Sequence, residues 1–229
     1  MPEESGAVPL AVPVLRETQV AGIRCLWLGR VEYSRALAAQ EDWIARFADR
    51  GDALLLLEHP PVYTTGRGGA EAHLPDAKVN VPVLRIGRGG DVTYHGPGQL
   101  VGYPIIDLRT RGRDVHRYLR DLEAGLIDTL GVLGVGAQRC AGRTGIWVAR
   151  PGGEPRKIAS IGIAVRRGIA WHGFALNLSV DLAAFDPIVP CGLEGVEMTS
   201  VALETGRAPA LAEVAEMLAT YLPPRICQA

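Results

Sequence analysis

Strand-like runs and helix-like periodicities alternate along this chain without a regular repeat. Apolar runs of strand length occur at 22–28, 53–58, 62–65, 83–86, 100–108, 145–149, 158–165 and 169–178. Apolar residues at helical spacings of three, four and seven positions mark 31–50, 114–135 and 209–222. Regular alternation would predict a doubly wound parallel sheet, whereas this irregular order predicts an α/β or α+β fold with a mixed sheet.

Cap and turn residues support several of these boundaries. Gly51 follows the first helical segment, and Asp114 stands where a capping carboxylate is favoured before the second. Arg166–Gly168 separates the last two strand-like runs and predicts a β-hairpin. We expect residues 1–20 to form a lead-in with one short strand and residues 21–229 to form a single domain.

Composition excludes several classes of protein. The 229 residues are 48% hydrophobic and 21% charged, which disfavours a disordered chain. No apolar run approaches the roughly 20 residues that a membrane helix needs. A net charge of −1 gives no support to nucleic-acid binding. Because Met1–Ser5 carries two acids where a secretory or transit peptide would be basic, we expect a cytoplasmic protein.

Four widely spaced cysteines favour a reactive thiol over a metal site or a disulfide framework. They are Cys25, Cys140, Cys191 and Cys227, and no two of them form a Cys-x-x-Cys pair. Cys25 and Cys140 fit buried core positions, and Cys227 lies close to the C-terminus. Cys191 stands between a proline and a glycine, on a shaped turn, and is the candidate nucleophile.

A cysteine attacks as a thiolate, so Cys191 needs a neighbouring cation or base. Histidine is the usual partner, and His95 and His172 both lie next to glycine in candidate site segments. Lys157 is the other candidate, because it leads directly into an apolar strand and is one of only two lysines among 24 Lys and Arg residues. Arginine keeps its proton in proteins, so a lysine here indicates a compact or titratable amine. Both partners remain open at this point.

A glycine-rich segment, Arg88–Gln99, is a candidate ligand loop. It holds four glycines in twelve residues, with Thr93, Tyr94 and His95 among them. Glycine lets a backbone approach a ligand closely, and successive N–H groups cradle an anion or a carbonyl. The order of the glycines matches neither the dinucleotide fingerprint nor the phosphate loop. The alternative is an ordinary glycine-rich hairpin.

Taken together, these segments resemble the octanoyltransferase family of lipoate biosynthesis. The matching stretches are Arg88–Gln99, Lys157–Gly162, His172–Asn177 and Pro190–Gly192, in the family's order. The resemblance implies the biotin/lipoate protein ligase fold, with a mixed central sheet flanked by helices and a smaller second sheet. It also implies that residues 21–229 form one catalytic domain and that the protein is an acyltransferase.

The resemblance implies a role for each site residue. Cys191 would carry the acyl group as a thioester, and Lys157 would activate the thiol and handle protons. The acyl pocket would be built from Arg88, Gly89, Gly90, Asp91, Val92, Thr93, Tyr94, His95, Ser160, Ile161, Gly162, Gly173, Phe174 and Ala175. Backbone N–H groups of the Cys191–Gly192 turn or of the Gly89–Gly90 loop are candidate oxyanion donors. No metal, ATP or other cofactor is implied, because the octanoyl group arrives already activated on phosphopantetheine.

The implied partners are octanoyl-acyl carrier protein as donor and lipoyl domains as acceptors, with the chain acting as a monomer. The acceptors would belong to 2-oxoacid dehydrogenase complexes and to the glycine cleavage H protein. An arginine-rich stretch fits either docking of acidic partners or a solvated face. Its members are Arg109, Arg111, Arg113, Arg117 and Arg120. The alternative functions are an ATP-dependent lipoate or biotin ligase, a cysteine hydrolase using His95 or His172, and a non-catalytic acyl-binding module.

Overall fold

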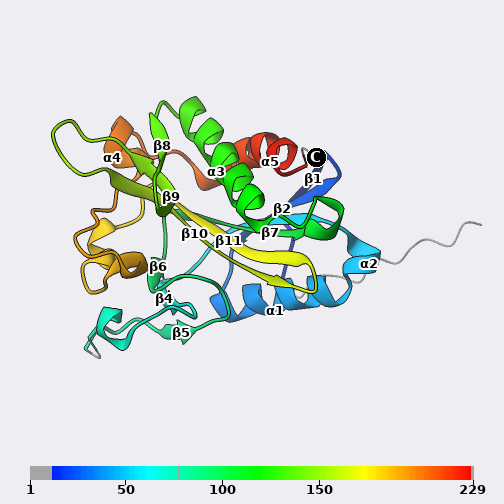
Figure 1. The fold of residues 1–229 in the computed structure, drawn as a ribbon, viewed down its shortest axis with the longest axis horizontal. Coiled ribbons are helices and arrows are strands. Elements are labelled where there is room, and N and C mark those ends of the chain that lie inside the picture. The colour runs from blue at the N-terminus through cyan, green and yellow to red at the C-terminus, as the bar shows by residue number, and fades with distance from the viewer. Residues whose placement is uncertain (1–11, 77, 228–229) are drawn as a thin grey trace, which may run out of the picture.

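A computed structural model describes residues 12–76 and 78–227, and within them the chain forms an eight-stranded mixed sheet (Figure 1). The strand order is β1-β2-β3-β7-β11-β10-β9-β8. The strands are β1 (Arg16–Val20), β2 (Ile23–Arg30), β3 (Ala53–Glu58), β7 (Gln99–Asp107), β8 (Ala137–Cys140), β9 (Arg143–Val148), β10 (Arg156–Arg166) and β11 (Ile169–Asn177). β2 and β3 pair in parallel and the other neighbours pair antiparallel, which confirms the predicted mixed sheet.

A smaller sheet of three strands lies beside the large one. Its order is β5-β4-β6, formed by β4 (Val62–Thr65), β5 (Val83–Arg85) and β6 (Thr93–His95). This is the second sheet that the family resemblance implies. β6 lies inside the glycine-rich segment, which the sequence pattern did not distinguish from a loop. The small sheet therefore gives that segment a fixed place next to β10 and β11.

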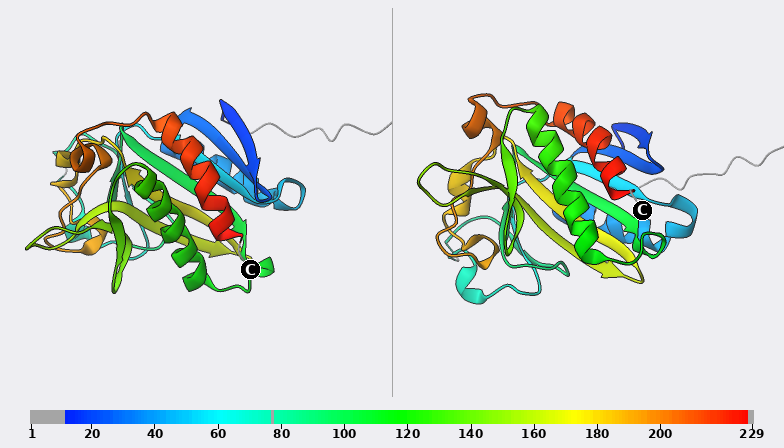
Figure 2. Two further views of the ribbon diagram at one scale, coloured as in Figure 1. Left: turned by 90° about the horizontal axis from the view of Figure 1, so that it is seen from above. Right: turned by 45° about the horizontal axis from the view of Figure 1, so that its top comes forward.

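Helices cover both faces of the large sheet. They are α1 (Tyr33–Ala45), α2 (Phe47–Arg50), α3 (Val115–Val132), α4 (Val201–Thr205) and α5 (Leu211–Ile226), with short 3₁₀ turns η1 (Glu71–His73), η2 (Leu108–Thr110), η3 (Leu182–Phe185) and η4 (Pro190–Gly192). α3 and α5 lie side by side on one face and α1 lies on the other (Figures 1 and 2). Among the described helices, none combines the length and the apolar character that crossing a membrane requires.

The apolar run at 53–58 is buried on both faces, as its lack of alternation suggests. Leu54 and Leu56 pack into the core under α3 and α5, and Leu55 and Leu57 pack into the core under α1. Neighbouring residues of a strand point to opposite faces, so one continuous apolar strand can serve two cores. β3 is therefore the central element between the two helical layers.

Most predicted boundaries agree with the structure to within a few residues. The Asp114 carboxylate caps α3 by accepting a hydrogen bond from the Arg117 N–H at 2.9 Å. The expected helix at 31–50 divides at Arg46 into α1 and α2. β8 and α4 were not predicted, because each is a short element of four or five residues with few buried side chains.

Gly173 of β11 lies so close to β7 that a side chain there has no room. A Cβ at Gly173 would stand 2.1 Å from the carbonyl oxygen of Gly102 and 2.5 Å from Pro104 Cδ. Both are parts of a paired strand in the middle of the sheet. We expect Gly173→Ala to lower the free energy of unfolding by about 1–3 kcal/mol, measured by urea titration.

Gly131 in α3 provides a matched control of opposite sign. It is exposed, and a Cβ there would meet nothing within 4 Å. Gly131→Ala should raise the free energy of unfolding by roughly 0.5–1 kcal/mol, because alanine favours the helix. If both substitutions changed the free energy of unfolding by the same amount and in the same direction, the close contact of Gly173 with β7 would be disproved.

Candidate active site

Lys157 and Cys191 meet in the structure although 34 positions separate them in the chain. Lys157 Nζ lies 3.2 Å from Cys191 Sγ. The lysine belongs to the first residues of β10 and is 2% exposed, whereas the cysteine is half-buried in η4. The two residues that the sequence singled out for chemistry are thus in direct contact.

Backbone hydrogen bonds bring this pair together. The N–H of Lys157 donates to the Glu197 carbonyl at 2.8 Å, and the N–H of Thr199 donates to the Lys157 carbonyl at 2.9 Å. The loop that carries Cys191 therefore returns to the start of β10. Its other anchor is the glycine-rich segment, where the Val92 carbonyl accepts the N–H of Cys191 at 2.8 Å.

The turn that presents the thiol holds Cys191 in an uncommon backbone conformation. Its φ and ψ are 59° and 18°, in the left-handed region that non-glycine residues seldom adopt. Gly192 follows with φ of 67°, and a Cβ there would lie 2.7 Å from Asp91 Oδ2. Asp91 Oδ2 also lies 2.5 Å from His73 Nδ1. A buried carboxylate thus packs directly against the strained turn.

Three further groups surround the pair formed by Lys157 and Cys191. Lys157 Nζ lies 5.1 Å from the centre of the Trp147 ring, in cation–π geometry. Ser160 Oγ lies 3.7 Å from Cys191 Sγ. Burial lowers the pKa of Arg88, and nearby Tyr33 and Cys191 act in the opposite direction. The side chains of Lys157 and Arg88 therefore both lie near the sulfur.

The pair lies in the wall of a cavity of about 340 Å³. This volume falls within the roughly 300–1,000 Å³ of small-molecule sites. Most of the predicted site residues line it: Arg88, Gly89, Gly90, Asp91, Thr93, His95, Lys157, Ser160, Ile161, Gly162, Gly173, Phe174, Ala175 and Cys191. Segments far apart in the chain thus meet in one concave site.

Val92 and Tyr94 do not line this cavity, in contrast to the expectation from the family resemblance. Both pack into a separate apolar cluster that includes Phe185. Because successive residues of a strand point to opposite faces, Thr93 and His95 face the cavity while their neighbours face away. Val92 still contributes to the site through its carbonyl, which anchors Cys191.

Several lining residues were missed by the sequence analysis: Tyr33, Tyr103, Leu119, Gly142, Arg143, Thr144, Ile163 and Leu193. Tyr103 lies inside an apolar strand run, and its hydroxyl is the one feature that distinguishes it from the neighbouring core residues. Tyr33 begins α1 and was counted only as part of the apolar face of a helix. No local pattern distinguishes such residues from ordinary core positions.

Neither of the two histidines considered as partners of Cys191 is hydrogen-bonded to the sulfur. His172 lines the cavity, but neither of its ring nitrogens has a hydrogen-bond partner among the described residues. His95 Nδ1 lies 2.8 Å from Gln99 Oε1, and its Nε2 lies 3.2 Å from Thr64 Oγ1. His59 Nε2 lies 2.7 Å from the Tyr103 hydroxyl. The thiol contacts the amine of Lys157 instead, so the geometry gives no support to a cysteine–histidine hydrolase.

Three of the four backbone N–H groups expected as oxyanion donors are already hydrogen-bonded within the chain. Cys191 N donates to Val92 O, and Gly192 N donates to Val189 O at 3.0 Å. Gly89 N likewise donates, to Ile163 O at 2.9 Å. These three amides therefore stabilise the turn and the glycine-rich segment, and none of them is free to bind an oxyanion.

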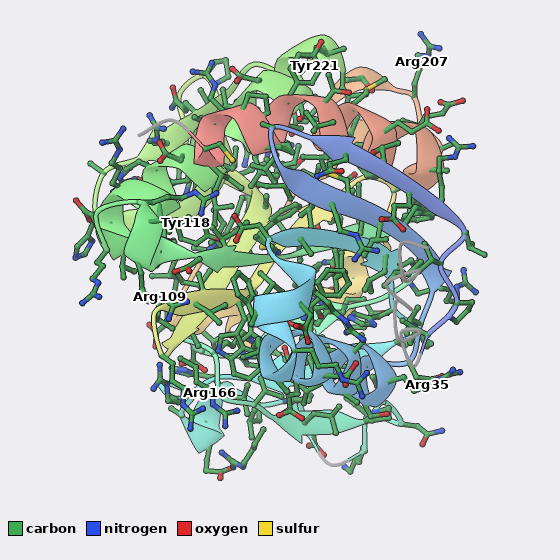
Figure 3. All side chains as sticks on the ribbon, turned by 90° about the vertical axis from the view of Figure 1, so that its right-hand side faces the viewer. Arg35, Arg109, Tyr118, Arg166, Arg207 and Tyr221 are labelled. Carbon is green, nitrogen blue, oxygen red and sulfur yellow. The ribbon has the colours of Figure 1, made fainter. Side chains whose placement is uncertain are left out.

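Four of the five clustered arginines are paired with acids. Arg109 pairs with Asp107, Arg111 with Asp52, Arg117 with Asp121 and Arg120 with Glu123. Arg109 packs along the β10–β11 hairpin, where Arg166 also projects (Figure 3). Because these ion pairs neutralise most of the stretch, the structure gives little support to its role as a docking surface.

Three buried histidines predict how the stability of the protein depends on pH. Burial lowers the pKa of His59 and His172 to about 4 and that of His95 to about 3, from an ordinary 6.5. Between pH 6.5 and 4 the unfolded chain binds more protons than the folded one. The free energy of unfolding should therefore fall with decreasing pH, by up to roughly 1.4 kcal/mol per pH unit for each histidine.

Urea titrations between pH 7 and 4.5 measure this slope. His172→Gln should remove about a third of it, because one of the three titrating groups is lost. His116 is exposed on α3, and His116→Gln should leave the slope unchanged. A slope that His172→Gln does not reduce would show that this ring is not kept neutral by the fold.

The family model and the similar proteins of known name assign the chain to the same family. The chain matches the model of the lipoyl protein ligase A/B catalytic domain over residues 32–223. It is 56% identical over 188 residues to an octanoyltransferase of Geobacter sulfurreducens, covering 81% of this chain and 77% of that protein. It is 50% identical over 198 residues to an octanoyltransferase of Citrifermentans bemidjiense, covering 86% and 94%.

Solved structures show the same fold at low identity. A lipoate-protein ligase A bound with ATP superposes with a TM-score of 0.66 at 18% identity, covering 82% of this chain and 79% of that one. Biotin protein ligase from Aquifex aeolicus gives a TM-score of 0.56 at 12% identity, covering 87% and 68%. The chain therefore belongs to the lipoyl protein ligase A/B catalytic-domain family, and it is an acyltransferase of the octanoyltransferase family that serves lipoylation.

Proposed function

We propose that this enzyme moves an octanoyl group from acyl carrier protein, through a thioester on Cys191, to the lysine amine of a lipoyl domain. The observation that carries the proposal is the 3.2 Å contact between Lys157 Nζ and Cys191 Sγ in the cavity wall. We propose that it acts in the cytoplasm, as a monomer and without a cofactor, on 2-oxoacid dehydrogenase complexes and the glycine cleavage H protein.

The first half-reaction exchanges one thioester for another. The Cys191 thiolate, paired with the Lys157 ammonium, attacks the octanoyl carbonyl carbon. The bond from that carbon to the phosphopantetheine sulfur then breaks, and the leaving sulfur takes the proton of Lys157. Because a thioester is exchanged for a thioester, the step needs no separate activation of the acid.

The second half-reaction forms the amide. A neutral lysine amine of the lipoyl domain attacks the acyl carbon, and the surplus proton on its nitrogen passes to the neutral amine of Lys157. The carbon–Sγ bond breaks, and the thiolate faces the ammonium again. One lysine thus gives a proton in the first half-reaction and recovers one in the second, so the resting pair is restored.

Ser160 and Lys157 are the proposed stabilisers of the oxyanion. Both lie within 3.7 Å of Sγ, so they lie close to the carbonyl oxygen once the acyl carbon bonds to sulfur. On the other side, Gly162 and Gly173 stand opposite each other on β10 and β11 and line the cavity. The space that their side chains would take is occupied by β7 and by Arg88 and Gly89, so the two glycines allow these segments to pack closely around the cavity.

The nucleophile is tested by intact-mass measurement. Wild-type protein mixed with octanoyl-acyl carrier protein should gain one octanoyl group that hydroxylamine removes, and Cys191→Ala should gain none. Turnover in Cys191→Ala should fall by at least about a thousandfold. Cys140→Ala is the matched control, because that half-buried cysteine lies in β8 outside the cavity lining. An octanoyl adduct that persists in Cys191→Ala would disprove the thioester.

The amine is tested by alkylation of Cys191 at neutral pH. Because the ammonium favours the ionised sulfur, we expect Lys157→Met to slow reaction of Cys191 with iodoacetamide by about tenfold, followed by peptide mass mapping. Lys78→Met removes the only other lysine, which is exposed, and should have no effect. Unchanged alkylation in Lys157→Met would assign the activation of the thiol to another group.

A further inference from the structure

The cavity does not end at Lys157. One part of it reaches Tyr33, His95, Tyr103 and Phe174, where an acyl chain fits. The same cavity is also lined by Leu119 of α3 and by Gly142, Arg143 and Thr144, which lead along the chain to the close contact between Gly145 and Lys157. None of these four residues was predicted as a site residue, and the proposed chemistry at Cys191 does not use them. We call them the far subsite.

The far subsite exists because two paired strands separate. β9 pairs with β10 at Val148, Trp147 and Ile146, opposite Arg156, Lys157 and Ala159, with an irregularity in register. β10 continues to Arg166, and Gly89 N donates to its Ile163 carbonyl at 2.9 Å. The glycine-rich segment thus takes over the edge of β10 from which β9 has departed.

Gly145 is the point where β9 turns away. Its φ is 117°, and a Cβ there would lie 2.5 Å from the Ala159 carbonyl oxygen and 2.8 Å from Lys157 Cε. On the other side, its N–H points to the buried Glu123 carboxylate of α3, with N and Oε1 3.4 Å apart. The two residues before it, Arg143 and Thr144, are therefore held just beyond the lysine amine.

The chemistry of a thioester explains a cavity of this shape. The acyl carbon carries an alkyl chain on one side and a sulfur with its own arm on the other. When that carbon reaches Sγ, the two arms leave in different directions, so an enclosed site needs two passages. The first passage is the acyl part of the cavity, and the far subsite is the second.

Resting on the proposed function, we propose that the far subsite binds the amide-containing thiol arm of the acyl donor, the pantetheine portion next to the thioester sulfur. The Leu119 side chain is half-buried and offers an apolar contact to methylene groups. The Arg143 guanidinium offers N–H donors to an amide carbonyl. Its carbon Cζ lies 5.6 Å from the centre of the Trp147 ring, which holds it beside Lys157.

Arg143 is available for this contact. Its side chain is 38% exposed, and its ion-pair partner Glu154 lies 3.4 Å away and is 81% exposed. Such a surface ion pair contributes little to stability, so its loss on binding costs little. A guanidinium held over an indole ring at the rim of a cavity is therefore a preorganised donor group.

Two acyl donors distinguish binding of the thiol arm from the acyl transfer itself. Octanoyl-pantetheine carries two amides beyond the sulfur, whereas S-ethyl octanethioate carries none. Single-turnover formation of the Cys191 adduct is followed by intact mass for each donor. Arg143→Met should slow acylation by octanoyl-pantetheine about tenfold, because a hydrogen bond from a charged group is lost. Acylation by S-ethyl octanethioate should change less than about twofold, because that donor makes no such bond.

Two more variants complete the test. Leu119→Trp fills the far subsite and should show the same difference between donors. Arg225→Met is the matched control, since Arg225 is 44% exposed, makes a single ion pair with Asp128 and lies on α5 outside the cavity. It should leave both donors unaffected. Each variant is judged by the ratio of its acylation rates with the two donors. A variant that merely folds poorly slows both rates equally and leaves this ratio unchanged.

Three results would overturn the proposal. They are an unchanged donor ratio in Arg143→Met, an unchanged donor ratio in Leu119→Trp, and a defect confined to the transfer from the acyl-enzyme to the lipoyl domain. The last would assign the far subsite to the acceptor lysine. If wild-type protein formed no adduct with either donor, the thioester on Cys191 would itself be refuted, an outcome that is distinct from the other three.

Discussion

The contact between a buried amine and a thiol is the interaction around which this site is arranged. Lys157 is 2% exposed, and taking a charge out of water costs several kcal/mol unless it is paired. The amine finds the Cys191 sulfur on one side and the Trp147 ring on another. The backbone of the same lysine pairs with residues 197 and 199, so the strand that buries the amine also positions its partner.

The glycine-rich segment supports the pair in a way that its composition did not indicate. Its Gln99 side chain donates from Nε2 to Asn177 Oδ1 at 2.9 Å, and Asn177 Nδ2 donates to the Thr199 carbonyl at 3.0 Å. Thr199 in turn donates its N–H to the Lys157 carbonyl. A buried polar network whose groups are satisfied is rigid. The segment that resembles a ligand loop therefore also fixes the backbone beside the Lys157 amine.

The sequence predicts the mixed sheet and the residue types of the site, because both depend on local patterns. Helical spacing located α3, and the rarity of lysine drew attention to Lys157. The family resemblance assigned all of Arg88–His95 to the pocket, including Tyr94, and neither the resemblance nor a local pattern determines which side of a short strand faces a cavity. They also do not determine where two paired strands separate, which depends on the conformation of Gly145 and on a carboxylate from a distant helix.

The separation of β9 from β10 has a consequence for the order of the reaction. In the proposed assignment the acyl group occupies the end of the cavity near Tyr33 and Tyr103, and the far subsite is the passage to the thioester carbon. While a thiol arm occupies that passage, the acceptor lysine has no access to the carbon. In the proposed mechanism the donor thiol departs before the amine enters, and the thioester on Cys191 keeps the acyl group in the meantime. The shape of the cavity and the strained nucleophile thus favour the same two-step transfer.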